Sequence, residues 1–302
     1  MKATMCSRVT AYLRLRRGFG YKLRIEGGML QNFARYADRS GHRGPLTREL
    51  ALRWAALPQN ASQLYRARRL EVLRVFAQHQ IALEPATHIP PRHVFGPAHC
   101  RRAPHIFTAA QIQQLLRRAG RLRGHLRPLT YSTLLGLLAC TGLRISEALA
   151  MGVDDVDWNR GLLLIRESKY QHSRWVPLHS TALAQLRFFD RRRRKLFPSA
   201  QHFFVSDRGR RFAYGTVRTA FRELARGMKS TGARSLVRLH DMRHSFACRV
   251  LRRWQRTRHG ATGRVAILAR YLGHRRVSDT YWYLTAIPEL LQDAAKHCRF
   301  IE

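Results

Sequence analysis

Four short stretches of the chain carry side chains that can bind an anion or transfer a proton. In chain order they are "CTGLRISEAL", "SKYQHSRWVPL", "RLHDMRHSFA" and "RYLGHRRVSDTYWYL". Arginine binds pairs of phosphate oxygens, histidine exchanges protons near neutral pH, and lysine and tyrosine can act as an acid and a nucleophile. Each stretch alone is a weak signal, but together these residue types suit an attack on a phosphodiester.

The first and third stretches present arginines at expected helix starts. Arg144 follows the turn formed by Thr141 and Gly142, where free N–H groups and the helix dipole already favour an anion. Glu147 lies three residues further on and can orient the guanidinium, although a simple surface ion pair explains the same spacing. His240 and Arg243 are also three residues apart, so one helix face would present both of them.

The second and fourth stretches supply a possible acid and a possible nucleophile. Lys169 lies in or beside a predicted hairpin loop, from which it could protonate a leaving oxygen or simply be solvated. Gly273 is expected to end a helix, and His274 follows it directly. The candidate hydroxyl groups belong to Tyr271, Tyr281 and Tyr283.

This order of residues resembles the tyrosine recombinase, or phage integrase, family. The resemblance runs from about Ile106 to Tyr283 and reaches weakly into the N-terminal helices. It implies that the family's nucleophilic tyrosine, nine residues after the histidine of the LGH-type box, is Tyr283, whereas Tyr281 is only seven residues after it. The other catalytic residues implied are Arg144 of the TGLR-type stretch, Lys169 five residues before Arg174 of the RxVPL-type strand, His240 and Arg243 of "HDMRH", and His274.

The remaining aromatic residues are then expected to support the nucleophile. Tyr281 and Trp282 would pack so as to fix the direction of Tyr283. Tyr271 would be buried against the helix that carries His240 and Arg243.

Charge favours a nucleic acid as the partner. The 302 residues include 56 Lys and Arg against 18 Asp and Glu, a formal net charge of +38. Residues 1–104 hold 19 basic and 5 acidic side chains, and residues 105–302 hold 37 and 13. Both parts can therefore contact a phosphate backbone, as a clamp would. The run "RRRRK" at 191–195 is interpreted as a solvated helix end.

Cysteine usage and hydropathy indicate a cytoplasmic protein. The five cysteines are far apart and form no CxxC motif, so neither a disulfide framework nor a zinc site is expected. The N-terminus lacks the apolar core of a signal peptide. The longest apolar run, Leu134 to Leu143, is too short to span a bilayer, so no membrane association is expected.

The pattern of elements predicts a mainly α fold with a small antiparallel β-sheet. Residues 1–83 show four helical segments and are expected to form a DNA-binding domain like the family's core-binding domain. Residues 84–105 contain five prolines and are predicted to be a stiff linker. Residues 106–302 would form the catalytic domain, in which "LLLIRE" and "RWVPL" are hairpin strands and a tail helix follows Pro288.

The resemblance implies a site-specific recombinase that cleaves and rejoins double-stranded DNA through a 3′-phosphotyrosine, with neither cofactor nor metal. Such an enzyme would act as a homotetramer on DNA, as an integrase or transposase of a mobile element. The alternatives are a chromosome-dimer-type resolvase, a type IB topoisomerase-like enzyme, and a non-enzymatic basic DNA-binding protein.

Overall fold

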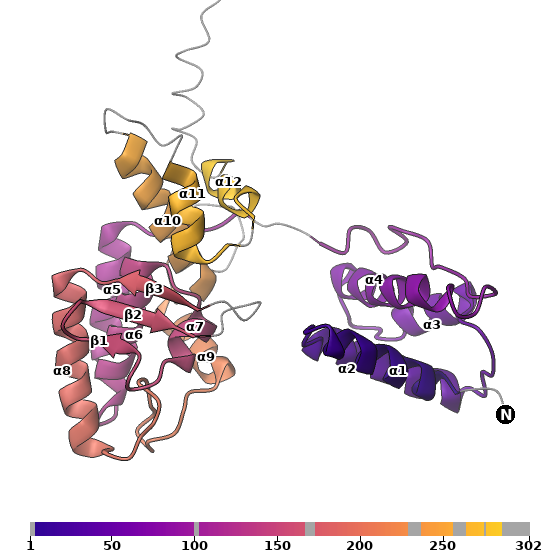
Figure 1. Cartoon of the computed structure of the whole chain (residues 1–302), viewed down its shortest axis with the longest axis horizontal. Coiled ribbons are helices and arrows are strands. Elements are labelled where there is room, and N and C mark those ends of the chain that lie inside the picture. The colour runs from indigo at the N-terminus through magenta and orange to yellow at the C-terminus, as the bar shows by residue number, and fades with distance from the viewer. Residues whose placement is uncertain are drawn as a thin grey trace, which may run out of the picture. The chain divides into compact units, whose positions relative to one another are not determined.

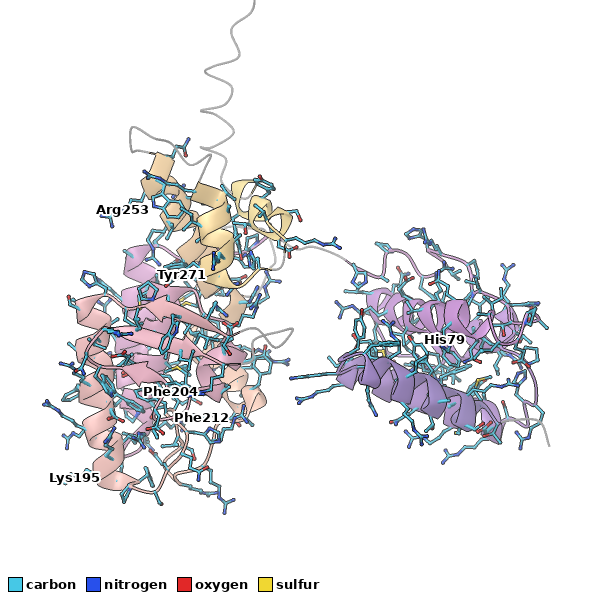
Figure 2. The ribbon with its side chains drawn as sticks, in the orientation of Figure 1. His79, Lys195, Phe204, Phe212, Arg253 and Tyr271 are labelled. Carbon is cyan, nitrogen blue, oxygen red and sulfur yellow. The ribbon has the colours of Figure 1, made fainter. Side chains whose placement is uncertain are left out.

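The chain divides into two compact units, Met1–Arg101 and Arg102–Glu302 (Figure 1). The computed structural model describes residues 4–99, 103–166, 173–228, 237–255, 264–274 and 276–285, without the side chains of residues 282, 284 and 285. Basic side chains project from both units, and Lys195 extends from the end of a helix in the second unit (Figure 2).

The first unit contains four helices around one apolar core. They are α1 (Met5–Gly18), α2 (Arg24–Arg39), α3 (Arg48–Ala56) and α4 (Gln63–Gln80). Thr4, Thr47 and Ser62 cap α1, α3 and α4, because each side-chain hydroxyl accepts a hydrogen bond from a free N–H of the first turn. The core includes Leu30, Phe33, Trp54, Leu73 and Phe76.

Residues 84–99 contain neither helix nor strand and lie along the first unit. His88 donates its N–H to the carbonyl of Leu46 at 2.8 Å, and Arg74 donates to the carbonyl of Pro90. Phe95 packs against the core of the unit. The proline-rich segment is therefore packed on the first unit, because it has partners at Leu46, which precedes α3, and on α4.

The second unit combines eight described helices with one small sheet. The three antiparallel strands follow the order β1 (Val156–Asp157), β2 (Leu162–Ile165) and β3 (Arg174–Pro177), with Leu163 opposite Val176. The helices are α5 (Ala109–Gly120), α6 (Arg127–Thr141), α7 (Ile145–Ala150), α8 (Ser180–Leu196), α9 (Tyr214–Leu224), α10 (Leu239–Gln255), α11 (Val265–Leu272) and α12 (Ser278–Thr285). A mainly α fold with a small antiparallel sheet is confirmed; β1 was not expected from the sequence.

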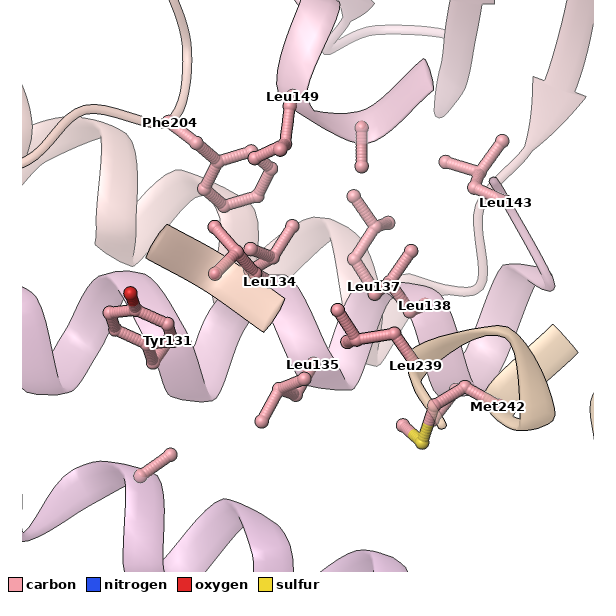
Figure 3. Packing of buried hydrophobic residues seen from close by; sticks show 14 of the residues in the cluster. Tyr131, Leu134, Leu135, Leu137, Leu138, Leu143, Leu149, Phe204, Leu239 and Met242 are labelled. Carbon is pink, nitrogen blue, oxygen red and sulfur yellow. The ribbon is translucent and has the colours of Figure 1, made fainter. Parts of the chain in front are cut away.

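Helix α6 runs through the core of the second unit. Leu134, Leu135 and Leu138 are almost completely buried and lie among Leu149, Phe204 and other side chains of the cluster (Figure 3). This packing explains why the apolar run of α6 has no polar face. Among the described helices, none has the length and apolar content needed to cross a membrane.

The basic run of α8 is only partly solvated. Four of its five side chains are exposed, but Arg193 is buried and donates to Asp190 at 2.7 Å. A buried arginine needs such a partner, because an unpaired charge in the interior is costly.

Gly142 ends α6 in the left-handed region, with φ of 64°. Its N–H donates to the carbonyl of Leu138 at 3.0 Å and so closes the helix. A Cβ at this position would collide with the ring of Phe246 on α10. The turn before Arg144 therefore requires glycine for both conformation and space.

Replacing Gly142 with alanine is expected to lower the free energy of unfolding by about 2 kcal/mol or more, since left-handed backbone and overpacking are both penalised. Gly120→Ala is the matched control, because a Cβ at the end of α5 meets nothing within 4 Å. Urea unfolding of both variants tests this expectation. Equal midpoints for Gly142→Ala and the wild-type protein would contradict it.

Candidate active site

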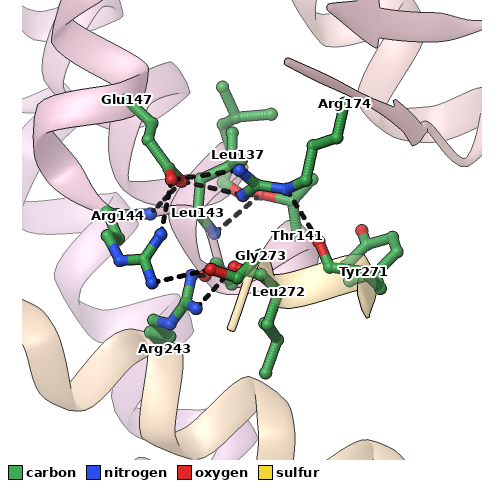
Figure 4. A network of polar contacts seen from close by, with 11 residues as sticks. Leu137, Thr141, Leu143, Arg144, Glu147, Arg174, Arg243, Tyr271, Leu272 and Gly273 are labelled. Carbon is green, nitrogen blue, oxygen red and sulfur yellow. Dashed lines mark hydrogen bonds and ion pairs between the residues drawn. The ribbon is translucent and has the colours of Figure 1, made fainter. Parts of the chain in front are cut away.

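At the start of α7, a single buried carboxylate binds two arginines. Arg144 donates from Nη1 to Oε1 of Glu147 at 2.8 Å, and its own N–H donates to Oε2 at 2.9 Å. Arg174 on β3 forms a two-pronged pair with the same carboxylate, at 3.1 and 2.9 Å (Figure 4). The Arg144–Glu147 pair suggested by the sequence is thus formed, but inside a network rather than on an open surface.

The charge of Glu147 is maintained despite its burial. Burial alone would raise the pKa of this carboxyl group, but hydrogen bonds and charge from Arg174, with further support from Arg144, hold the pKa below its usual value. Glu147 is therefore ionised at neutral pH and offsets part of the positive charge of both arginines.

Main-chain carbonyl groups at helix ends fix the guanidinium groups from the other side. Arg144 donates to Gly273 O at 3.1 Å, and Arg174 donates to Tyr271 O at 2.9 Å. These acceptors belong to the C-terminal end of α11, whose last carbonyl groups lack partners within the helix. Gly273 caps α11 with φ of 68°, and a Cβ there would lie 2.8 Å from Nη1 of Arg174.

Arg243 is buried between two helix ends. It donates to Gly142 O at 2.8 Å and to Leu272 O at 2.6 Å, so it joins the C-terminus of α6 to that of α11. Its exposed fraction is 1%. Burial, together with the positive charge of Arg144, lowers the pKa of Arg243 to about 10, which leaves it cationic at neutral pH.

Two of the predicted histidines are neutral at physiological pH. Partial burial and the charge of Arg243 lower the pKa of both His240 and His274 to about 4. His240 lies in the first turn of α10 and is exposed, whereas His274 follows Gly273. Nδ1 of His274 lies 2.8 Å from the hydroxyl of Thr280. If Thr280 donates this hydrogen bond, Nε2 of His274 carries the proton and can donate to a ligand.

Tyr283 on α12 lies against these histidines. Its exposed fraction is 3%, and its ring stacks on that of His274 with centroids 5.9 Å apart. His244 contacts the same ring edge to face at 5.2 Å. Burial raises the pKa of the Tyr283 hydroxyl, and the nearby Arg243 opposes that rise.

The other tyrosines of this region have different surroundings. Tyr271 stacks on Phe246 of α10 with centroids 5.7 Å apart, which confirms the expected contact with the helix of His240 and Arg243. Tyr281, in contrast, is 52% exposed, so its expected packing role is wrong. Two residues along a helix correspond to roughly 200° of rotation, so the burial of Tyr283 turns Tyr281 outward. The side chain of Trp282 lies outside the described residues.

The structure brings together five of the six catalytic residues expected from the sequence: Arg144, His240, Arg243, His274 and Tyr283. Lys169 lies outside the described residues. Arg174 was expected only to mark the position of Lys169, and no role was expected for His244. The spacing of four from His240 could have placed His244 on the same helix face.

Within the described parts of the chain, no group of three or more His, Cys, Asp or Glu side chains is arranged to hold a metal ion.

Similarity to known proteins identifies the family to which this chain belongs. Residues 105–289 match the profile of the phage integrase family. The chain is 38% identical to the integrase/recombinase y4rB of Sinorhizobium fredii over 306 residues, covering 97% of this chain and 96% of that protein. The chain therefore belongs to the phage integrase family, which is the class of tyrosine-type site-specific recombinases.

More distant relatives agree with this assignment. Tyrosine recombinase XerA of Pyrococcus furiosus is 28% identical over 166 residues, or 55% of this chain and 54% of that one. The Tn1549 transposon integrase, solved in complex with transposon right end DNA, has a TM-score of 0.69 at 14% identity and covers 98% of this chain and 99% of that one. This likeness shows that the fold is the integrase fold.

Glu147→Gln is expected to lower the free energy of unfolding by about 3 kcal/mol at pH 7, because it leaves two arginines without their shared anion. The folded-state pKa of Glu147 is depressed, so its contribution is complete above the unfolded value near ~4.3 and is lost as the pH falls through the folded value. Urea unfolding between pH 7 and pH 3 should show the two proteins converging in acid. Asp154→Asn, at an exposed position, is the control, and a constant difference across this range would contradict the expectation.

Proposed function

We propose that this protein cleaves and rejoins double-stranded DNA through a covalent 3′-phosphotyrosine formed by Tyr283. The observation that supports this most directly is the convergence of two cationic arginines and two neutral histidines on one buried tyrosine. Arg144 and Arg243 carry the positive charge, and His240 and His274 lie beside them.

The arginines would bind the phosphodiester at the cleavage point. Each guanidinium group is held by protein acceptors, so its direction is set before DNA arrives. Preorganised donors stabilise the charge that develops as the nucleophile adds, and they do so without further reorganisation. His274 would donate from Nε2 to a non-bridging oxygen of the same phosphate.

The tyrosine hydroxyl must lose its proton to attack phosphorus. A free phenol has a pKa near ~10, and burial raises that of Tyr283, so the hydroxyl is protonated in the absence of DNA. Proximity to Arg243 favours the phenolate, and neutral His240 can accept the proton or bind the phosphate. The phenolate oxygen then bonds to phosphorus, and the bond between phosphorus and the 5′-oxygen breaks.

Lys169 would protonate the leaving 5′-oxygen, which departs as a free hydroxyl group. The phosphotyrosine ester keeps the energy of the broken bond, so a 5′-hydroxyl from another strand can reverse the reaction and reseal the DNA. The two arginines supply the charge neutralisation that metal ions provide in other nucleases.

Integration or transposition of a mobile element is the reaction that we propose for this chemistry. The support is the near full-length similarity to y4rB and the fold shared with a transposon integrase that was solved with transposon DNA. The protein would act in the cytoplasm and assemble as a tetramer on DNA. A chromosome-dimer-type resolvase is the second candidate, since the chain is also similar to a protein named only as a tyrosine recombinase, XerA.

Tyr283→Phe is expected to abolish covalent attachment while DNA binding is retained, because only the nucleophilic oxygen is removed. A pool of randomised nicked duplexes incubated with the protein would reveal the adduct as a band that resists denaturant. Tyr281→Phe is the matched control and should form the adduct at the wild-type rate. An adduct that persists in Tyr283→Phe and disappears in Tyr281→Phe would reverse the assignment.

Deletion of residues 286–302 tests whether the predicted tail helix joins protomers. This segment lies outside the described residues. Assembly on DNA should weaken, whereas binding of one protomer to a half-site should be unchanged. Gel-shift titration separates the two species, and an equal loss of both would count against the tail as the link between subunits.

A further inference from the structure

His244 occupies the space between two residues of the proposed catalytic site. It lies one turn after His240 on α10, and the two rings meet edge to face with centroids 4.8 Å apart. The Tyr283 ring lies 5.2 Å from the same imidazole, at an interplanar angle of 65°. His244 is thus the ring that connects the exposed His240 to the buried Tyr283.

The imidazole of His244 contains a buried polar atom without a partner. Its exposed fraction is 9%, and Nδ1 makes no hydrogen bond to the described residues. An unpaired buried polar atom is destabilising, so its presence calls for an explanation. A phenylalanine would fill a similar space without this penalty, and packing alone therefore does not account for a histidine here.

The electrostatic surroundings keep the ring uncharged. Burial, followed by the influence of His240 and Arg238, lowers the pKa of His244 to about 3. A neutral imidazole with its proton on Nε2 offers Nδ1 as a hydrogen-bond acceptor. The phenol of Tyr283 is a donor from a ring that already contacts His244.

We propose that His244 is a positioning residue for strand cleavage: its ring sets the direction of the Tyr283 phenol, and its unpaired Nδ1 accepts the phenol hydrogen bond when Tyr283 turns toward the phosphodiester. This hydrogen bond increases electron density on the attacking oxygen and fixes its approach. The proposal rests on the proposed function, because it requires Tyr283 to be the nucleophile.

Two substitutions distinguish the contribution of the His244 ring from that of its Nδ1 atom. His244→Phe keeps an aromatic ring but removes Nδ1, whereas His244→Asn keeps a polar atom close to the Nδ1 position but removes the ring. At saturating DNA, His244→Phe should slow adduct formation roughly 3–10-fold, the rate equivalent of one neutral hydrogen bond, with unchanged DNA affinity. His244→Asn should be faster than His244→Phe in the same assay.

Thermal unfolding and leaving-group chemistry distinguish this role from a structural one. His244→Phe should be at least as stable as the wild-type protein, because the unpaired atom is gone. The nicked duplex is also prepared with sulfur in place of the 5′-bridging oxygen. Sulfur can leave as a thiolate without a proton donor. The defect of His244→Phe should persist on this duplex, whereas that of Lys169→Ala should disappear.

Any of three results would overturn the proposal. His244→Phe could form the adduct at the wild-type rate, it could lose stability together with rate, or its slower adduct formation could disappear on the duplex that contains sulfur. Failure of the proposed function has a different signature. In that case the wild-type protein forms no adduct on any nicked duplex, or the Tyr283→Phe variant still forms one.

Discussion

The carboxylate of Glu147 is the interaction on which the proposed site depends. It binds guanidinium groups from two different elements, the start of α7 and strand β3, and both groups continue to carbonyl acceptors at the end of α11. One buried anion therefore sets the position of a helix, a strand and the turn that carries His274. Three hydrogen bonds from the two guanidinium groups and one from the main-chain N–H of Arg144 converge on this carboxylate. It therefore stays ionised despite the cost of burial.

The arrangement also explains how several cations can lie close together in this part of the protein. Arg144 and Arg174 share the charge of Glu147, and Arg243 is stabilised by the negative ends of carbonyl dipoles. The histidines contribute no charge at neutral pH, because partial burial and the nearby arginines lower the pKa of both imidazoles to about 4.

Much of the fold followed from the sequence because periodicity and caps are local signals. Four helices were expected in residues 1–83 and the first unit contains four, and β2 and β3 were recognised from short apolar runs. β1 has only two residues and depends on its partner strand, so the sequence carried no signal for it. The packing of residues 84–99 on the first unit depends on contacts with Leu46, Arg74 and the core of that unit, which are distant in sequence, and composition alone indicated a linker.

The proposed site was predictable to a similar degree. Spacing and resemblance selected Arg144, His240, Arg243, His274 and Tyr283, and the structure brings these residues together. The role of Arg174 was hidden, because its contacts with Glu147 and Tyr271 join positions 27 and 97 residues apart. The outward direction of Tyr281 was missed, since the phase of α12 is set by its contacts with α10 and α11 and not by its own sequence.

The three arginines of the site are anchored to main-chain oxygens at Gly142, Tyr271, Leu272 and Gly273. A carbonyl oxygen is present whatever side chain a residue carries. The identity of residues 271 and 272 can therefore change without removing an acceptor, provided that α11 still ends at the same place. Accumulated mutation in the surrounding scaffold would alter packing and stability long before it altered the direction of the guanidinium groups.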